Sequence, residues 1–127
     1  MPCVLLVEDE ALIRFAALDA LEELGFRVKE ANTVVEARAA MQMPDEVVDA
    51  VIVDVGLPDG RGDDLAAELR AADQRLPIVI ASGYGEAQFR ARFPNDPMMA
   101  FLDKPYEHTQ LERVLARLGV KGKHASV

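Results

Sequence analysis

Short apolar runs of strand length alternate along the chain with longer segments in which apolar residues recur with a helical period. The first run, residues 3–7, is apolar throughout, and residues 11–24 carry apolar side chains every three or four positions. Gly25 is a typical residue for the end of that helix. The same pattern predicts strands at residues 26–31, 47–54, 77–81 and 99–102, and helices at residues 33–41, 63–72, 86–93 and 107–118.

Strict alternation of strands and helices is typical of a parallel sheet covered by helices on both faces. Strands that are apolar on both sides favour the same α/β architecture, because such strands are buried on both faces. The length of 127 residues fits one compact domain. We expect this domain to occupy residues 1–120, with residues 121–127 as a C-terminal tail, and the chain to fray from residue 119 onward.

Polar and charged residues stand where the predicted strands end. Glu8 and Asp9 follow the first strand, Asp54 ends the third, Ser82 follows the fourth and Lys104 lies just after the fifth. In an open parallel sheet, ligands bind beyond the carboxyl ends of the strands. The sequence therefore predicts that these side chains meet at one edge of the sheet.

The carboxylates in this set indicate a cation site, because clustered carboxylates repel one another unless a cation lies between them. A hard divalent ion such as Mg²⁺ (or Mn²⁺) takes oxygen ligands. The candidate ligands are the side chains of Glu8, Asp9 and Asp54 and the backbone carbonyl of Gly56.

The remaining members of the set suit phosphoryl transfer. Lys104 is a point charge for a phosphoryl oxygen, and Ser82 offers a hydroxyl donor. Asp54 is the candidate nucleophile, with the metal and Lys104 neutralising charge on the phosphoryl oxygens. Asp59, Asp63 and Asp64 are expected to be turn and capping residues.

Four stretches, VLLVEDE, VIVDVGLPDGRG, PIVIASGYG and AFLDKPY, follow in this order along nearly the whole chain. Together they resemble the receiver domain of two-component response regulators (the CheY-like family). The family's motif positions correspond to the acidic pair Glu8 and Asp9, the phospho-acceptor Asp54, the switch residues Ser82 and Phe101, and the Lys104-Pro105 pair.

The resemblance implies a flavodoxin-like (βα)5 fold with strand order 2-1-3-4-5 and a cis peptide bond between Lys104 and Pro105. It implies a histidine kinase or phosphotransfer protein as phosphoryl donor, and Mg²⁺ as cofactor. Ser82 and Lys104 would then move toward the phosphoryl oxygens while Phe101 turns inward. A downstream protein would bind the face made by the fourth helix, fifth strand and fifth helix.

The stretch PIVIASGYG also resembles an alphaproteobacterial single-domain subgroup with a P-F-x-F-A-T-G-G/Y-Y type of motif. Isoleucines replace its aromatic residues and Ser82 replaces its threonine. Gly83 and Gly85 predict a mobile segment over residues 83–96. Gly56 leaves the phosphoryl group without a shielding side chain, a role that Tyr84 could take instead.

The net charge and the cysteine content limit the classes of binding partner and the cellular compartment that we expect. Twenty-two acidic residues against 14 basic ones give a net charge of -8, which speaks against direct binding to nucleic acid or an anionic membrane. The single cysteine, Cys3, excludes an internal disulfide and favours a reducing compartment, the cytoplasm. No apolar run reaches transmembrane length.

We therefore expect a stand-alone phospho-acceptor, which signals by protein contact or acts as a phosphate sink or shuttle, and which is not an enzyme acting on a separate substrate. Two alternatives stay open: a receiver excised from a larger regulator or hybrid kinase, and a pseudo-receiver that binds partners without phosphorylation. An aspartyl-phosphate hydrolase is disfavoured because Gly56 stands where such enzymes carry a second acid. A flavin site is disfavoured because the acidic first loop would repel the flavin phosphate.

Overall fold

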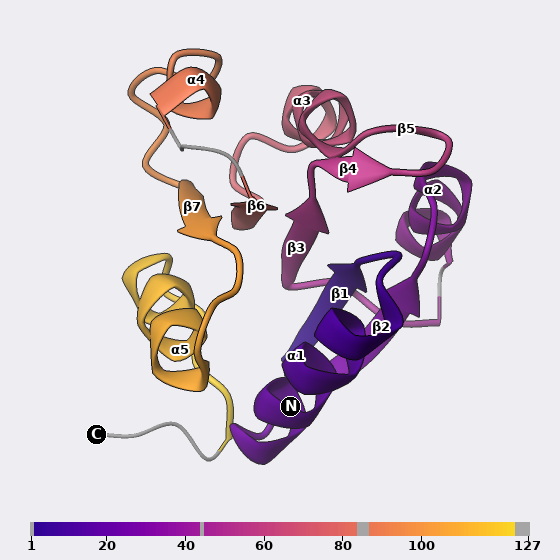
Figure 1. The fold of residues 1–127 in the computed structure, drawn as a ribbon, viewed down its shortest axis with the longest axis vertical. Coiled ribbons are helices and arrows are strands. Elements are labelled where there is room, and N and C mark those ends of the chain that lie inside the picture. The colour runs from indigo at the N-terminus through magenta and orange to yellow at the C-terminus, as the bar shows by residue number, and fades with distance from the viewer. Residues whose placement is uncertain (1, 44, 84–86, 124–127) are drawn as a thin grey trace.

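The computed structural model describes residues 2–43, 45–83 and 87–123. Five parallel strands form one sheet in the order β2-β1-β3-β6-β7, which is the predicted order 2-1-3-4-5 once a small additional hairpin is set aside (Figure 1). These strands are β1 (Cys3–Val7), β2 (Arg27–Ala31), β3 (Ala50–Asp54), β6 (Ile78–Ser82) and β7 (Met99–Asp103). The helices are α1 (Ala11–Glu23), α2 (Val34–Gln42), α3 (Gly62–Ala72), α4 (Ala87–Arg90) and α5 (His108–Arg117).

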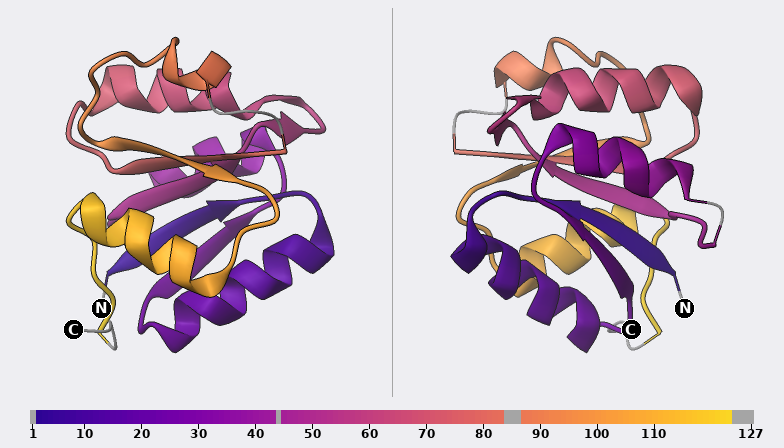
Figure 2. Two further views of the ribbon diagram at one scale, coloured as in Figure 1. Left: turned by 60° about the vertical axis from the view of Figure 1, so that its left-hand side comes forward. Right: turned by 90° about the vertical axis from the view of Figure 1, so that its right-hand side faces the viewer.

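The sheet separates two hydrophobic cores. Successive strand residues point to opposite faces, so that Val4 and Leu6 belong to the core beneath α1 and α5. Leu5 and Val7 belong to the core on the other face, which α2, α3 and the α4 segment cover. Figure 2 shows the sheet edge-on between these two helical layers. The predicted burial of both faces is confirmed.

The third strand is shorter than its apolar run suggested. It begins at Ala50 and not at residue 47. Val47 is exposed, and Asp49 binds the backbone of Cys3 at the start of β1. The Asp49 carboxylate accepts a hydrogen bond of 2.7 Å from the backbone N–H of Cys3, and the Asp49 N–H donates to the Cys3 carbonyl at 2.8 Å. These two hydrogen bonds join the residue before β3 to the first residue of β1.

A two-stranded antiparallel hairpin, β4 (Gly56–Leu57) and β5 (Gly60–Arg61), follows Asp54 and was not predicted. Each of its strands has only two residues, which is too short for any periodic pattern to reveal. It leads directly into α3.

The fourth helix is also shorter than predicted. It covers residues Ala87–Arg90, whereas residues 86–93 were expected. Phe89 is the buried residue of this turn, and Pro94 disfavours helical backbone in the residue before it. The predicted extension through residue 93 is therefore wrong, and residue 86 lies outside the described residues.

The expectation of a frayed tail from residue 119 is wrong for residues 119–123. Val120 is buried, and the backbone N–H of Lys123 donates to the Gly25 carbonyl at 3.2 Å. A side chain at Gly122 would overlap the backbone carbonyl of Leu24. This stretch therefore packs against the end of α1.

Candidate functional site

The sheet register brings the predicted residues to one edge. Val7 pairs with Val53, so the next residues, Glu8 and Asp54, come side by side. Ser82 is the last residue of β6 and pairs with Asp103, directly before Lys104. Residues from four strand ends that are far apart in sequence thus share one site.

Lys104 lies between two buried carboxylates. Its Nζ is 2.9 Å from Oε1 of Glu8 and 3.0 Å from Oδ1 of Asp54. Only 2% of Glu8 and 6% of Asp54 are exposed, and 9% of the Lys104 side chain. Charges so poorly solvated are stable only when they are paired, and the lysine supplies the pairing.

The shared site changes the proton affinity of its members. Burial, with the neighbouring Asp54 charge, raises the pKa of Glu8 to about 7, although the Lys104 hydrogen bond opposes this. Burial alone would lower the pKa of Lys104, but hydrogen bonds to Glu8 and Asp54 raise it above its ordinary value. Lys104 therefore stays protonated across the physiological range, while Glu8 titrates within it.

Glu10 joins this group, and Asp9 is placed differently from the prediction. Carboxylate oxygens of Glu8, Glu10 and Asp54 all lie within 4.8 Å of one another, and Glu10 Oε1 is 3.6 Å from Lys104 Nζ. Asp9 is exposed and does not belong to the acidic group found among the described residues. Arg14 is close to its backbone, donating from Nη1 to the carbonyls of Glu8 and Asp9 at 3.1 and 3.5 Å.

This donor set fits a hard divalent cation, because three carboxylates converge on one point beside a hollow that solvent can enter. The hollow has a volume of about 340 Å³. Its lining includes Glu10, Asp54, Gly56, Ser82 and Lys104. Of the predicted residues, Asp54, Gly56, Ser82 and Lys104 border this space, and Glu10 joins them. Glu8 is buried beside Lys104 and does not line the hollow, and Asp9 is exposed.

The backbone around Asp54 is fixed by a close approach of Gly62. The Gly62 N–H donates to the Val55 carbonyl at 2.8 Å, and a Cβ on Gly62 would overlap the backbone carbonyl of Asp54. The chain between these two residues forms the β4–β5 hairpin. Gly62 is therefore required for the return of the chain beside Asp54, which spacing alone did not reveal.

The peptide bond between Lys104 and Pro105 is cis, as the resemblance implied. Phe101 on β7 is half-buried and packs against the core on the α3 face. The Arg90 guanidinium lies 5.1 Å from the centre of its ring. Tyr84, the predicted shielding residue, lies outside the described residues.

Comparison with known proteins shows the family to which the chain belongs. The family model for the response regulator receiver domain matches residues 4–116. The chain therefore belongs to the response regulator receiver domain family, and its fold is the CheY-like, flavodoxin-like one that the sequence predicted.

Individual relatives carry this domain in different settings. The chain is 39% identical over 108 residues to the sensor kinase CckA of Brucella abortus, covering 85% of this chain and 11% of the kinase. It is 34% identical over 120 residues to the KDP operon transcriptional regulatory protein KdpE of Escherichia coli, covering 94% of this chain and 51% of the regulator. The chain thus spans about half, or much less, of these curated relatives.

A solved structure shows the same arrangement of elements. The non-phosphorylated HemR receiver domain from Leptospira biflexa superposes with a TM-score of 0.80 at 31% identity, covering 93% of this chain and 94% of that domain. Within residues 2–43, 45–83 and 87–123, no helix has the length and apolar character needed to cross a membrane.

Proposed function

We propose that this chain is a phospho-acceptor module of a two-component pathway and that Asp54 receives the phosphoryl group. The observation that carries the proposal is the contact of Asp54 with Lys104 at 3.0 Å, at the base of a solvent-accessible hollow that also holds Glu10 and Ser82. A carboxylate that served only to end a turn would not need a buried lysine and a group of acids beside it.

The proposed reaction transfers a phosphoryl group from a phosphohistidine. A carboxylate oxygen of Asp54 forms a bond to phosphorus, and the bond from phosphorus to the histidine nitrogen breaks, leaving the electron pair on the ring. Lys104 then exchanges its contact with the carboxylate for one with a phosphoryl oxygen. The Ser82 hydroxyl donates to another phosphoryl oxygen. The phosphorylated chain could also transfer the phosphoryl group from Asp54 to water. In both reactions the chain acts on its own aspartate, and it is not proposed as an enzyme for a separate substrate.

Glu8, Glu10 and Asp54, with the Gly56 carbonyl, are the residues that would hold Mg²⁺. Asp9 stays a predicted ligand whose side chain would have to turn inward. When bound, Mg²⁺ neutralises charge on the phosphoryl oxygens and on the carboxylates. Glu8 must be ionised to take part, and its raised pKa makes this ionisation pH-dependent near neutrality.

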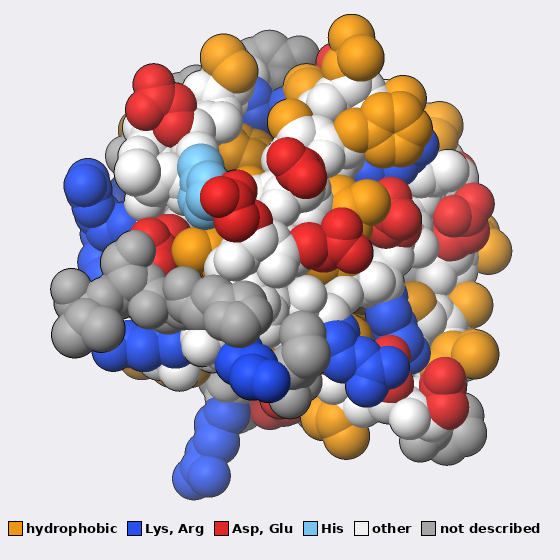
Figure 3. Space-filling model, turned by 90° about the horizontal axis from the view of Figure 1, so that it is seen from below, with side chains coloured by type: hydrophobic (Ala, Val, Ile, Leu, Met, Phe, Trp, Pro, Cys, Tyr) orange, Lys and Arg blue, Asp and Glu red, His pale blue; other side chains and the backbone are white. Residues whose placement is uncertain are grey.

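The surface of α1 beside the site offers a docking area for the phosphoryl donor. Leu12 is 85% exposed and Phe15 is 56% exposed. A groove of about 430 Å³ between α1 and α5 shares Ile13 and Pro105 with the hollow over Asp54. Figure 3, a view from the end of the molecule where α1 and α5 lie, shows hydrophobic side chains among acidic ones. A partner with an apolar helix and basic flanks fits this surface.

Output is proposed to proceed through the face made by α4, β7 and α5. Arg90 of α4 lies over Phe101 of β7, so an inward turn of Phe101 would remove one contact between these two elements. Phosphorylation would then change the populations of two arrangements of this face. Direct nucleic-acid or membrane binding is not part of the proposal, given the net charge of -8.

The setting we favour is a stand-alone module, in line with the resemblance of PIVIASGYG to a single-domain subgroup. We favour the cytoplasm as its compartment because the chain has a single cysteine. One similar protein is named as a sensor kinase and another as a transcriptional regulatory protein. The alternative is therefore that this domain works inside a longer protein of either kind. The phosphoryl chemistry proposed for Asp54 is the same in both settings.

A phosphotransfer assay tests the proposal. A histidine kinase core or phosphotransfer protein carrying labelled phosphohistidine is mixed with the native chain or with Leu12→Asp, in Mg²⁺ and in EDTA. We expect label to move to the native chain in Mg²⁺ alone, and more slowly to Leu12→Asp, while acetyl phosphate labels both chains equally. Labelling of neither chain by any donor would favour the pseudo-receiver.

A further inference from the structure

Asp59 joins the hairpin that follows Asp54 to a helix more than twenty residues earlier in the chain. Its Oδ1 accepts a hydrogen bond of 2.7 Å from the backbone N–H of Val34, and its Oδ2 accepts one of 3.1 Å from that of Val35. These N–H groups begin α2, where a helix has no internal acceptors for them. The hydrogen bond from the Val34 N–H, with that from Val35, lowers the pKa of Asp59.

Helix α2 already has a local cap. The Thr33 hydroxyl accepts a hydrogen bond of 3.0 Å from the backbone N–H of Glu36. A helix can use several acceptors at its first turn, and among the described residues the Asp59 carboxylate is the acceptor that comes from a distant part of the chain. Asp59 therefore caps α2 and, by the same hydrogen bonds, attaches the hairpin to that helix.

The hairpin has further attachments besides Asp59. Leu57 packs, partly buried, against the core on the α3 face, and Arg61 donates to Asp63 at 3.0 Å. Its ladder consists of the Gly56–Arg61 and Leu57–Gly60 pairs, and most of its residues are exposed. One of its ends is fixed where Gly62 meets Asp54. At its tip, Gly60 lies so close to Val34 that an added Cβ would be 3.3 Å from Val34 Cγ2. The Asp59 hydrogen bonds hold the tip against this same residue.

We propose that Asp59 is a positioning residue for the cation site: by fixing the hairpin on the first turn of α2, it sets the position of the Gly56 carbonyl next to Asp54. The inference rests on the proposed function, in which Gly56 and Asp54 hold Mg²⁺. Groups that orient metal ligands without touching the metal affect affinity strongly. Loss of Asp59 lets the hairpin sample other positions, and the Gly56 carbonyl then spends less time where a cation needs it.

The test compares Mg²⁺ affinity in four full-length chains: native, Asp59→Ala, Asp59→Asn and Thr33→Ala. Thr33→Ala is the matched control, because it removes a cap from the same helix without touching the hairpin. Dissociation constants come from titration with Mg²⁺ alone, followed by calorimetry or amide chemical shifts, and urea unfolding reports stability in parallel. We expect Asp59→Ala to weaken Mg²⁺ binding by about tenfold, Thr33→Ala to change it by less than about twofold, and Asp59→Asn to recover much of the loss because its amide oxygen can still accept.

Equal effects of Asp59→Ala and Thr33→Ala on Mg²⁺ binding would overturn the inference, because Asp59 would then be a helix cap only. Failure of the native chain to bind Mg²⁺ would overturn the proposed cation site itself, and the inference with it. The native titration therefore separates the two failures.

Discussion

At the scale of single residues, the Lys104 ammonium allows Glu8 and Asp54 to share a buried site. Its contacts of 2.9 and 3.0 Å place one positive charge between two carboxylates. A bound Mg²⁺ would supply the same neutralisation. Lysine and metal are therefore expected to compete for the carboxylates, and each should compensate in part for loss of the other.

Lys104→Met tests this competition. In EDTA at mildly alkaline pH, the variant should lose about 3 kcal/mol of unfolding free energy, because breaking a buried ion pair leaves charges unpaired. Mg²⁺ should restore most of this loss, and should bind the variant at least as tightly as the native chain. Urea unfolding with and without Mg²⁺ measures both effects. Equal stability of the two chains in EDTA would contradict this account of the site.

Gly62→Ala tests the close approach beside Asp54. The added methyl would overlap a backbone carbonyl, and the expected cost is about 3 kcal/mol or more of unfolding free energy, at the upper end of overpacking effects. Gly56→Ala, in the adjoining hairpin, is the matched control, since the nearest contact of its methyl among the described residues is Asp54 Oδ2, at 4.0 Å. Similar unfolding curves for the two variants would show that Gly62 is not needed for the turn.

Sequence reasoning placed Asp54, Lys104 and Ser82 together because strand ends in a parallel sheet converge whatever the loops do. It did not identify Glu10. The run Glu8-Asp9-Glu10 offers three acids, and which of them face the site depends on how the chain turns from β1 into α1. No periodicity extends over such a turn, so the position of each side chain follows from the backbone and cannot be predicted from residue type.

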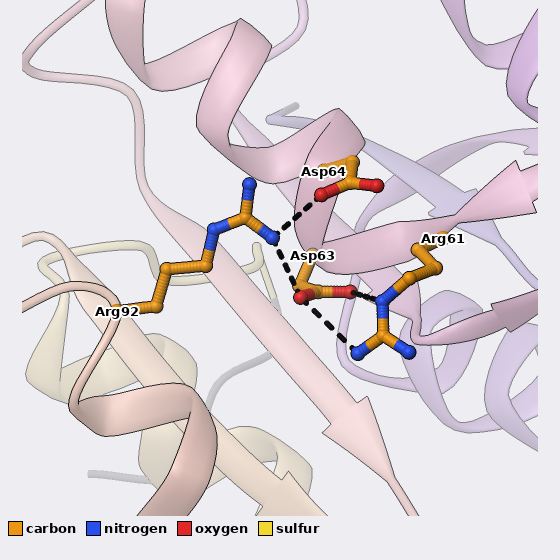
Figure 4. A network of polar contacts seen from close by, with 4 residues as sticks. All are labelled: Arg61, Asp63, Asp64 and Arg92. Atoms are coloured by element: carbon orange, nitrogen blue, oxygen red, sulfur yellow. Dashed lines mark hydrogen bonds and ion pairs between the residues drawn. The ribbon is translucent and has the colours of Figure 1, made fainter.

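At the scale of elements, arginine–aspartate contacts hold the α4 segment on α3. Asp63, only 3% exposed, accepts from Arg61 at 3.0 Å and from Arg92 at 2.7 Å, and Arg92 also donates to Asp64 at 2.6 Å (Figure 4). The expected turn and capping residues Asp63 and Asp64 thus belong to an ion-pair network. This network links the start of α3, next to the Asp54 hairpin, with the segment that follows Ser82.

A second link lies at the other end of α3. Arg70 donates to Asp96 at 2.7 Å and to the Met98 carbonyl at 3.1 Å. These charged contacts add to the apolar packing of Phe89 and Phe93 in attaching residues 87–98. The predicted mobility of residues 83–96 stays a prediction, and residues 84–86 lie outside the described residues.

Arg92→Ala should loosen this segment selectively. We expect faster amide hydrogen exchange over residues 87–98 and a loss of about 1 kcal/mol of unfolding free energy, since Arg92 is partly solvated. Arg75→Ala, which changes an exposed arginine between α3 and β6, is the control. Unchanged exchange in Arg92→Ala would mean that apolar packing alone holds the segment.

The same network predicts an acid-dependent stability. Burial alone would raise the pKa of Asp63, but Arg61 and Arg92 lower it below its ordinary value. Its stabilising contribution is therefore complete above the unfolded-state pKa and is lost as the pH falls through the lower folded-state pKa. Urea unfolding across the acid range should show a shallower loss of stability for Asp63→Asn than for the native chain. Parallel pH profiles would exclude Asp63 as a contributor.

The elements themselves were predicted to different degrees. The five strands and the long helices followed from apolar patterns, because burial on two faces leaves a strong signal in sequence. The β4–β5 hairpin left none, since its residues are few, exposed and held by contacts to Asp54 and α2. The ion-pair network was equally invisible, because Asp63 and Arg92 meet only after α3 and the α4 segment pack together.

At the scale of the whole molecule, the sheet lies between two cores, and Asp54, the proposed phospho-acceptor, stands at its edge. Asp54 ends a strand whose neighbouring residues face the α1–α5 layer on one side and the α2–α3 layer on the other. A change in charge at Asp54 would therefore occur close to both helical layers. Charge neutralisation there should stabilise the fold as a unit.

Ligand-dependent unfolding measures this global effect. Mg²⁺ with beryllofluoride, a mimic of the phosphoryl group, should stabilise the native chain by about 2–3 kcal/mol at ligand concentrations near a hundred times Kd. This corresponds to a rise in Tm of roughly 10 °C. Asp54→Asn should lose the beryllofluoride effect. A Tm shift retained in that variant would place the acceptor elsewhere.

The most direct test of the central claim is the intact mass of the chain after incubation with acetyl phosphate, for the native protein and for Asp54→Asn, each with Mg²⁺ and with EDTA. The account predicts the gain of one phosphoryl group by the native chain in Mg²⁺ only, and no gain by Asp54→Asn under either condition. A phosphoryl group gained by Asp54→Asn, or gained by the native chain equally well in EDTA, would contradict the assignment of Asp54 as the metal-dependent acceptor.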